Sequence, residues 1–216
     1  MCAGRLVAAG QYGYYRAVQR IRPQRTGPPR GASPAPGTLV HVIAPDTKNW
    51  TWVLTRACPE CGFDASRCQA DEVAGLVREN SQAWERLLQD GAIKPGRPDG
   101  STWSTLEYAC HVRDVYRRFF NRIDLMLSED DPLFENWDQD ASAVADAYEQ
   151  QVPETVVHEL TAAARAVASQ LDQVSGPAWQ RAGRRSDGAS FRVETIAPYM
   201  VHDAVHHAWD VDRQRR

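Results

Sequence analysis

Two histidines near the end of the sequence, His202 and His206, are spaced to bind one metal ion. Residues four apart in an α-helix lie within about 40° of one another around the axis, so both imidazoles would leave the same face. Such a pair can bind one cation without bending the helix, and this spacing recurs in zinc sites. The adjacent His207 points about 100° away and is the poorer candidate.

A third ligand has to come from another helix, and His111 is the best-placed histidine. It borders the apolar stripe of a predicted helix, about 60° from Tyr108, so its ring would face partly inward. A buried imidazole costs stability unless its nitrogens are paired, and a metal ion would satisfy one of them. Three protein ligands and one open position are typical of a catalytic metal. The alternative is that these are ordinary histidines, because an isolated HxxxH pair is a weak signal.

Other polar side chains are candidates for roles beside the metal ion. Glu107 lies one helical turn before His111, and Asp210 lies one turn after His206. Either carboxylate could orient a ligand imidazole or act as a general base. Glu107 also completes a capping box that begins at Ser104, and this role is favoured for it. The candidates for substrate binding are Arg184, Arg185 and Tyr199.

The sequence Cys58-Pro-Glu-Cys61-Gly62 is similar to one knuckle of a zinc ribbon. A zinc ribbon needs four ligands and usually a second CxxC, whereas only Cys68 is near in sequence. A redox CxxC normally opens a helix in a βαβ unit, and this chain has no such pattern. We interpret the segment as a structural turn, with a second metal site or a redox pair as the alternatives.

Helical periodicity predicts the elements that position these side chains. Apolar residues recur at spacings of three and four in two segments, a capping box opens one of them, and Pro153 suits the first turn of a third. The four long helices are predicted at about 70–89, 104–129, 153–174 and 193–213, with a short helix at 141–150. An aromatic run at 49–54 is predicted to be extended, and 184–188 to be a polar loop. The predicted fold class is all-α, a four-helix bundle.

Composition excludes several classes of function. The chain of 216 residues is 43% hydrophobic and 25% charged, which is typical of a soluble globular domain. Its formal charge of −3 argues against general nucleic-acid binding. No apolar stretch is long enough for a membrane span or a secretory signal. Five cysteines do not suggest a disulfide framework, so we expect a cytoplasmic protein with reduced thiols.

The first 40 residues differ from the rest. Residues 1–45 contain six arginines and no acid, which leaves 19 basic against 28 acidic side chains in the remainder. The segment is rich in Pro and Gly, so we expect residues 1–40 to be a disordered, dispensable basic extension and 41–216 to be the folded domain. A phosphate-binding arm and a transit peptide are the alternatives.

Two stretches carry a resemblance to a known family. Trp103-Ser-Thr-Leu-Glu-Tyr-Ala-Cys-His111 and Tyr199-Met-Val-His202-Asp-Ala-Val-His206-His207 are similar to the signature regions of the DinB-like metal-binding superfamily, which includes the N-terminal domain of mycothiol-dependent maleylpyruvate isomerase. The resemblance covers about 46–212. In this family a histidine on the second helix joins an H-x3-H or E-x3-H pair on the last one. By position it implies His111, His202 and His206 as ligands to zinc, nickel or a similar ion.

The resemblance also suggests a reaction. It implies an enzyme in which the metal ion activates a low-molecular-weight thiol, such as mycothiol or bacillithiol, for an S-transferase or isomerase reaction. The alternatives are a non-catalytic metal-binding or stress-response protein and a metal-dependent hydrolase. The expected partners are a small-molecule substrate or thiol, with neither nucleic acid nor membrane, and a homodimer is an open alternative to a monomer.

Overall fold

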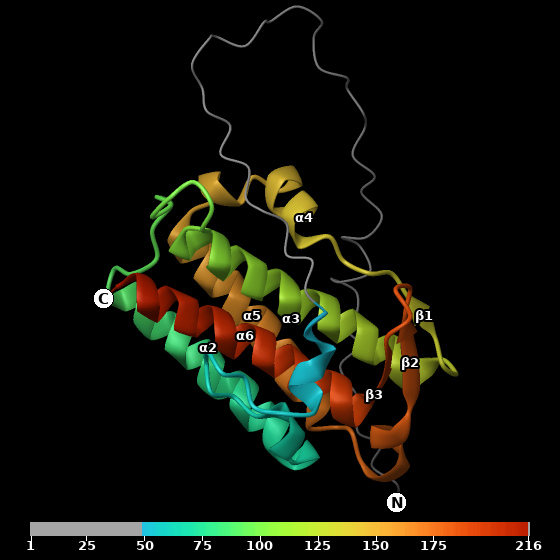
Figure 1. The fold of residues 1–216 in the computed structure, drawn as a ribbon. Helices are drawn as coiled ribbons and strands as arrows, with labels where there is room; N and C mark the ends of the chain where they lie inside the picture. Colours follow the sequence, from blue (N-terminus) through green and yellow to red (C-terminus); the bar gives the residue numbers. More distant parts are fainter. Residues whose placement is uncertain (1–48, 216) are drawn as a thin grey trace, which may run out of the picture. The chain divides into compact units, whose positions relative to one another are not determined.

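Four long helices form a bundle in the computed structural model, which describes residues 49–215 (Figure 1). They are α2 (Val73–Gln89), α3 (Thr105–Ser128), α5 (Pro153–Leu171) and α6 (Val193–Gln214). Both α2 and α3 pack against α5 and α6, and the buried apolar side chains of all four helices form one core. The predicted four-helix bundle is therefore confirmed.

The start of α3 follows from its capping residues. The Oγ of Ser104 accepts a hydrogen bond from the backbone N–H of Glu107, and the Glu107 carboxylate accepts one from the backbone N–H of Ser104. These reciprocal bonds satisfy backbone donors that have no partner inside the helix. From there an apolar stripe including Val112, Phe119 and Met126 is buried against the other helices.

A buried polar chain ties three helices together near the middle of the bundle. The Tyr116 hydroxyl on α3 donates to Oδ1 of Asn80 on α2 at 2.8 Å. Nδ2 of Asn80 in turn donates to the backbone carbonyl of Ala204 on α6 at 3.0 Å. Because a buried polar group is costly when it is unpaired, these bonds favour one register of α6 against its neighbours.

A small sheet covers one end of the bundle. Its strands are β1 (Leu133–Phe134), β2 (Ala182–Arg185) and β3 (Ser190–Arg192), in the order β1-β2-β3. The prediction of a polar loop at 184–188 was wrong at its start, because Arg184 and Arg185 belong to β2. The sheet lies close to α3, since a Cβ atom on Gly183 would lie 2.6 Å from Cγ of Met126. Such a contact allows only glycine there without rearrangement.

The shorter elements differ from the sequence predictions in detail. Trp50–Leu54 is a 3₁₀ helix (η1) that packs on α6, so the prediction of an extended segment was wrong. The Asn49 side chain accepts a hydrogen bond from the Thr51 backbone N–H at 3.0 Å and thereby caps this turn. The predicted helix at 141–150 is divided into α4 (Gln139–Ala145) and the 3₁₀ turn Tyr148–Gln150, separated by Ala147 with φ of 47°.

The structure bears in different degrees on the expectations about membrane spans and about residues 1–40. No helix in the described part is long and apolar enough to cross a membrane. The expected extension, residues 1–40, lies outside the described residues, and its disorder and dispensability stay predictions.

The buried carboxylate of Glu107 gives a stability prediction. Its two oxygens accept hydrogen bonds from the Arg97 guanidinium at 2.5 and 2.9 Å. Burial alone would raise the pKa of Glu107, but Arg97 and the capping N–H lower it below its usual value. Glu107→Gln should therefore cost about 2–3 kcal/mol of unfolding free energy in urea at pH 7.

The pH dependence of that cost has a definite sign. Because the folded-state pKa is depressed, the stabilisation is complete above the ordinary pKa of 4.5 and is lost as the pH falls through the folded value. The difference between wild type and Glu107→Gln should shrink in that acid range. A difference that is independent of pH down to acid unfolding would contradict this assignment, and Arg97→Gln supplies the partner for a double-mutant cycle.

Candidate metal centre

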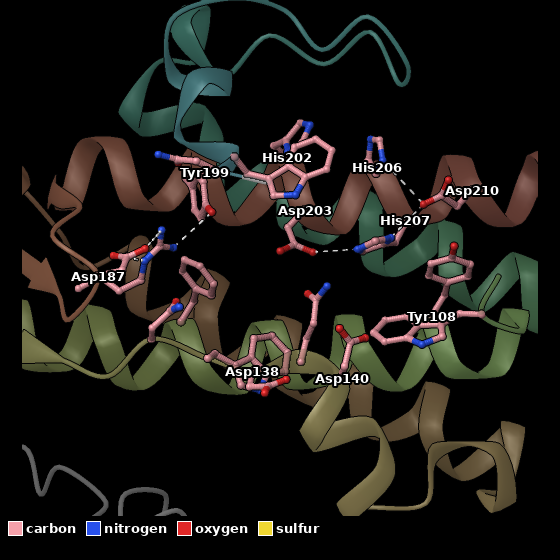
Figure 2. Close-up of a pocket in the computed structure, with 18 of the residues that line it drawn as sticks. Tyr108, Asp138, Asp140, Asp187, Tyr199, His202, Asp203, His206, His207 and Asp210 are labelled. Atoms are coloured by element: carbon pink, nitrogen blue, oxygen red, sulfur yellow. Dashed lines mark hydrogen bonds and ion pairs between the residues drawn. The ribbon is translucent and has the colours of Figure 1, made fainter. Parts of the chain in front are cut away.

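One group of ligand-type side chains joins α3 to α6. Nε2 of His111 lies 3.0 Å from Oδ1 of Asp203, and Nε2 of His207 lies 3.4 Å from the same oxygen. The three ligand atoms all lie within 4.8 Å of one another. Figure 2 shows Asp203 and His207 projecting from α6 towards α3. The two residues are four apart and therefore share a face of the helix.

Aromatic rings fix the orientation of both imidazoles. The His111 ring stacks on Trp137 with centroids 5.0 Å apart and planes 5° apart. The ring of His207 stacks on Tyr108 at 5.0 Å and meets His111 edge-on at 4.7 Å. Side chains held in this way have few alternative rotamers, so the site is preorganised.

Asp210 orients His207 from the other side. Its Oδ2 lies 3.0 Å from Nδ1 of His207. A carboxylate that accepts the Nδ1 proton leaves the Nε2 lone pair directed at Asp203 and His111, which is the usual support for a metal-binding histidine. Two roles were predicted for Asp210, the orientation of an imidazole and general-base catalysis. The distance to Nδ1 of His207 supports the first of them.

The protonation states suit metal binding. Burial lowers the pKa of His111, although Asp203 acts in the opposite direction. Burial would raise the pKa of Asp203, but the neighbouring His111 and His207 bring it to about 2. At neutral pH the group therefore contains the Asp203 carboxylate beside a neutral His111 imidazole, and both are forms that ligate a cation. Nδ1 of His111 is buried without a hydrogen-bond partner among the described residues.

A second group lies on a neighbouring face of the same helix. The ligand atoms of His202 and His206 lie within 4.8 Å of those of Cys58 and Cys61. Figure 2 shows His202 and His206 on the side of α6 away from α3. The ligand set predicted from the sequence, His111 with His202 and His206, is thus divided between two groups, and as a shared site it stays a prediction.

Sequence reasoning missed two members of the first group. It passed over Asp203 and ranked His207 below His206, because the search was for a pair of histidines. The signal was present, since Asp203 and His207 have the same i, i+4 spacing one residue further along. A shift of one residue turns the pair by about 100°, so the direction of α3 decides which pair faces His111.

A pocket of about 870 Å³ opens beside the first group. It is lined by Asp203 and His207, by His202 and His206, and by the aromatic rings of Trp103, Tyr108, Phe119 and Trp137. Two arginines, Arg122 and Arg185, also reach it. The rest of the lining is largely polar and includes six carboxylates, those of Glu60, Asp138, Asp140, Asp187, Asp203 and Asp210. A pocket of this size beside candidate metal ligands can accommodate a small molecule.

The remaining predicted residues divide between the pocket and other roles. Arg185 and Tyr199 line the pocket, where Nη1 of Arg185 lies 3.4 Å from the Tyr199 hydroxyl. Arg184 instead pairs at the exposed surface with Asp131 at 2.8 Å and does not line the pocket. Glu107 is engaged by the helix cap and Arg97, so it is not available as a base in this pocket.

These residues fit a divalent metal ion. One carboxylate and two imidazoles, with the carboxylate–histidine support from Asp210, form a donor set common for zinc and similar ions. Nε2 of His111 and Nε2 of His207 both approach Oδ1 of Asp203, at 3.0 and 3.4 Å, so one ion could contact all three atoms. Three ligands beside a pocket leave room for a fourth from a small molecule.

Comparison with known proteins identifies the family of this chain. The family model of the DinB superfamily matches residues 86–211, which is more than half of the chain, so this chain belongs to the DinB superfamily. The matched segment contains His111, Asp203 and His207 and excludes Cys58 and Cys61.

A solved structure with a similar fold is YfiT from Bacillus subtilis, described as a probable metal-dependent hydrolase with an unusual four-helix bundle topology. It is 17% identical, covers 68% of this chain and 87% of its own, and superposes with a TM-score of 0.59. At that identity the likeness shows the fold alone. No curated protein matches the sequence.

The geometry predicts which substitutions remove the same ion. His111→Ala and His207→Ala should each lower the zinc bound per chain by one equivalent, measured by elemental analysis after dialysis. The double variant should lose no more than either single variant, because one ion needs both ligands. His158→Ala, an exposed histidine on α5, is the matched control. Wild-type zinc content in His207→Ala would contradict this grouping.

Proposed function

We propose that this chain is a metal-dependent enzyme that acts on a small anionic substrate with a low-molecular-weight thiol as co-substrate. The observation that carries the proposal is the position of Asp203 and His207, which group with His111, at a pocket that also contains a buried arginine, Arg122. A purely metal-storing protein would have no need of a substrate-sized aromatic pocket at its metal site.

Arg122 supports an anionic substrate. It is only 6% exposed, and no carboxylate forms an ion pair with it in the described part of the chain. Its Nη2 donates to the Glu135 carbonyl at 2.8 Å, which leaves other donors of the fork unused. Burial, with help from Arg118 and Arg185, lowers its pKa to about 10. A carboxylate or phosphate on the substrate would relieve this cost.

The groups around the pocket have separable roles. A divalent ion held by the three ligands would supply Lewis acidity that favours the ionised form of a thiol or water. Trp103 and Trp137 pack against His111 and exclude solvent from its ring. Arg185 is held by Asp187 at 2.8 Å and by Tyr199, so it offers a fixed guanidinium whose charge Asp187 already balances.

The resemblance to the maleylpyruvate isomerase domain favours thiol chemistry. The substrate named in that family is a dicarboxylate, and Arg122, which has no ion pair with a carboxylate in the described part of the chain, suits one of its carboxylates. In such a reaction the thiol proton passes to solvent and the sulfur forms a bond to an electrophilic carbon of the substrate. In a transferase the leaving group departs from that carbon with its bonding electrons, whereas in an isomerase a π bond opens and re-forms when the C–S bond breaks again. Zinc is the preferred ion and nickel the second candidate.

Hydrolysis is the second candidate function. It is favoured by the description of YfiT as a probable metal-dependent hydrolase. Water would then take the place of the thiol, and the reaction would require the metal ion but no added thiol. The cytoplasmic location and the homodimer stay expectations from the sequence.

Substrate recognition can be tested without knowing the substrate. Maleate, a small dicarboxylate, should bind the zinc-loaded chain, and Arg122→Met should weaken that binding about tenfold or more in isothermal titration calorimetry. Arg184→Met removes the same charge from an exposed position outside the pocket and should leave the affinity unchanged. Equal affinities for both variants would refute the role of Arg122.

Thiol binding can be tested with cobalt as the metal. Millimolar mycothiol or bacillithiol should add a sulfur-to-metal absorption band to the cobalt-loaded Cys58→Ser/Cys61→Ser variant, in which that pair contributes no sulfur. His207→Ala in the same background should abolish the change. If neither thiol alters the spectrum while metal-dependent ester cleavage is found, hydrolysis replaces thiol transfer.

A further inference from the structure

Two cysteines and two histidines form a closed cluster beside the proposed active site. Sγ of Cys58 lies 3.7 Å from Nδ1 of His206, and all four ligand atoms of the cluster lie within 4.8 Å of one another. Zinc–sulfur and zinc–nitrogen bonds of about 2.3 and 2.0 Å in a tetrahedron place sulfur and nitrogen about 3.5 Å apart. Cys58 and His206 therefore already have nearly the spacing of two ligands in a tetrahedral zinc site, and the other two ligand atoms are close enough to complete it.

The two histidines are presented as ligands. Nε2 of His202 is buried and has no hydrogen-bond partner in the described part of the chain. His206 directs Nδ1 at Cys58, while its Nε2 lies 3.6 Å from Glu60 and 3.8 Å from Asp210. These carboxylates favour a proton on Nε2, which leaves the Nδ1 lone pair for a metal ion.

The cysteine turn has the shape that a zinc knuckle requires. The Gly62 N–H donates to the Cys58 carbonyl at 2.9 Å, and the Cys58 N–H donates to the Phe63 carbonyl at 2.8 Å. Gly62 has φ of 76°, a value that favours glycine, so the chain reverses directly after Cys61. Both thiols are thereby turned towards α6, and both are free of disulfides.

Trp50 packs against both imidazoles of the cluster. Its ring centroid lies 5.7 Å from that of His202 and 5.3 Å from that of His206. Cys58 is 2% exposed and His202 is 3% exposed, while Cys61 is partly buried, so most of the cluster is covered by protein. Two thiolates balance the charge of a divalent cation, and two neutral imidazoles complete the tetrahedron, so a buried site carries no net charge.

We propose that Cys58, Cys61, His202 and His206 bind a structural zinc ion, separate from the ion held by His111, Asp203 and His207. This site fixes the segment 50–67 to α6 and so holds Trp50 and Glu60 at the pocket. Four protein ligands leave no open position, which distinguishes it from a catalytic site. The inference does not depend on the proposed reaction.

The two thiols provide a direct test in the full, unmodified chain. Zinc-loaded protein should react with iodoacetamide about tenfold more slowly at Cys58 and Cys61 than chelator-treated protein, as followed by peptide mass spectrometry. Cys110, a buried thiol on α3 outside both groups, is the internal control and should stay equally protected in both samples. Chelation should also speed tryptic cleavage after the exposed Arg56 and Arg67.

Metal counting separates this site from the first. Cys58→Ser/Cys61→Ser should lose one zinc per chain and retain the one that His111→Ala removes, whereas Cys68→Ser should lose none. Zinc-independent alkylation of Cys58 and Cys61 would overturn the proposal. So would a Cys58–Cys61 disulfide in protein purified without oxygen, which would identify a redox pair.

Discussion

The rotation of α6 about its own axis is the constraint on which the rest of the structure depends. Successive residues of a helix are turned by about 100°, so Asp203 and His207 face α3 while His202 and His206 face the cysteine turn. The same helix therefore offers two pairs of ligands in two directions (Figure 2). The Asn80 hydrogen bond to the Ala204 carbonyl favours the one register that presents both pairs correctly.

The polar groups on this helix are costly unless each has a partner. In the first group Asp203 serves two imidazoles, and its pKa of about 2 reflects that pairing in spite of burial. In the second, burial lowers the pKa of His202 to about 4, and raises that of the Cys61 thiol to about 11, although a backbone hydrogen bond from Phe63 acts the other way. Neutral imidazole is ready for a metal ion, whereas the thiol needs one nearby before it ionises.

The bundle was predictable from the sequence because each long helix carries its own periodicity and start signal. The capping box at Ser104 and Pro153 at the first turn of α5 gave the starts to within a residue. The short sheet could not be predicted in this way. Strands of two to four residues have too few side chains for a period, and the close packing of Gly183 on Met126 is a tertiary contact that no local pattern reports.

The candidate site was predicted only in part, for a related reason. Spacing identified His111 and placed metal ligands on α6, but it does not say which face of α6 meets α3. The cysteine turn was interpreted as structural because no second CxxC follows. Two histidines about 140 residues further along supply the missing ligands of the cluster, and only tertiary packing brings His202 and His206 to Cys58.

An anomalous difference map of the zinc-loaded crystal, recorded at the zinc absorption edge, tests the central claim most directly. Because α6 carries a pair of ligands on each of two faces, we expect two zinc peaks per chain. One should lie in bonding distance of His111, Asp203 and His207, and the other among Cys58, Cys61 and the remaining pair of histidines. A single peak bonded by His111 together with His202 and His206 would contradict it.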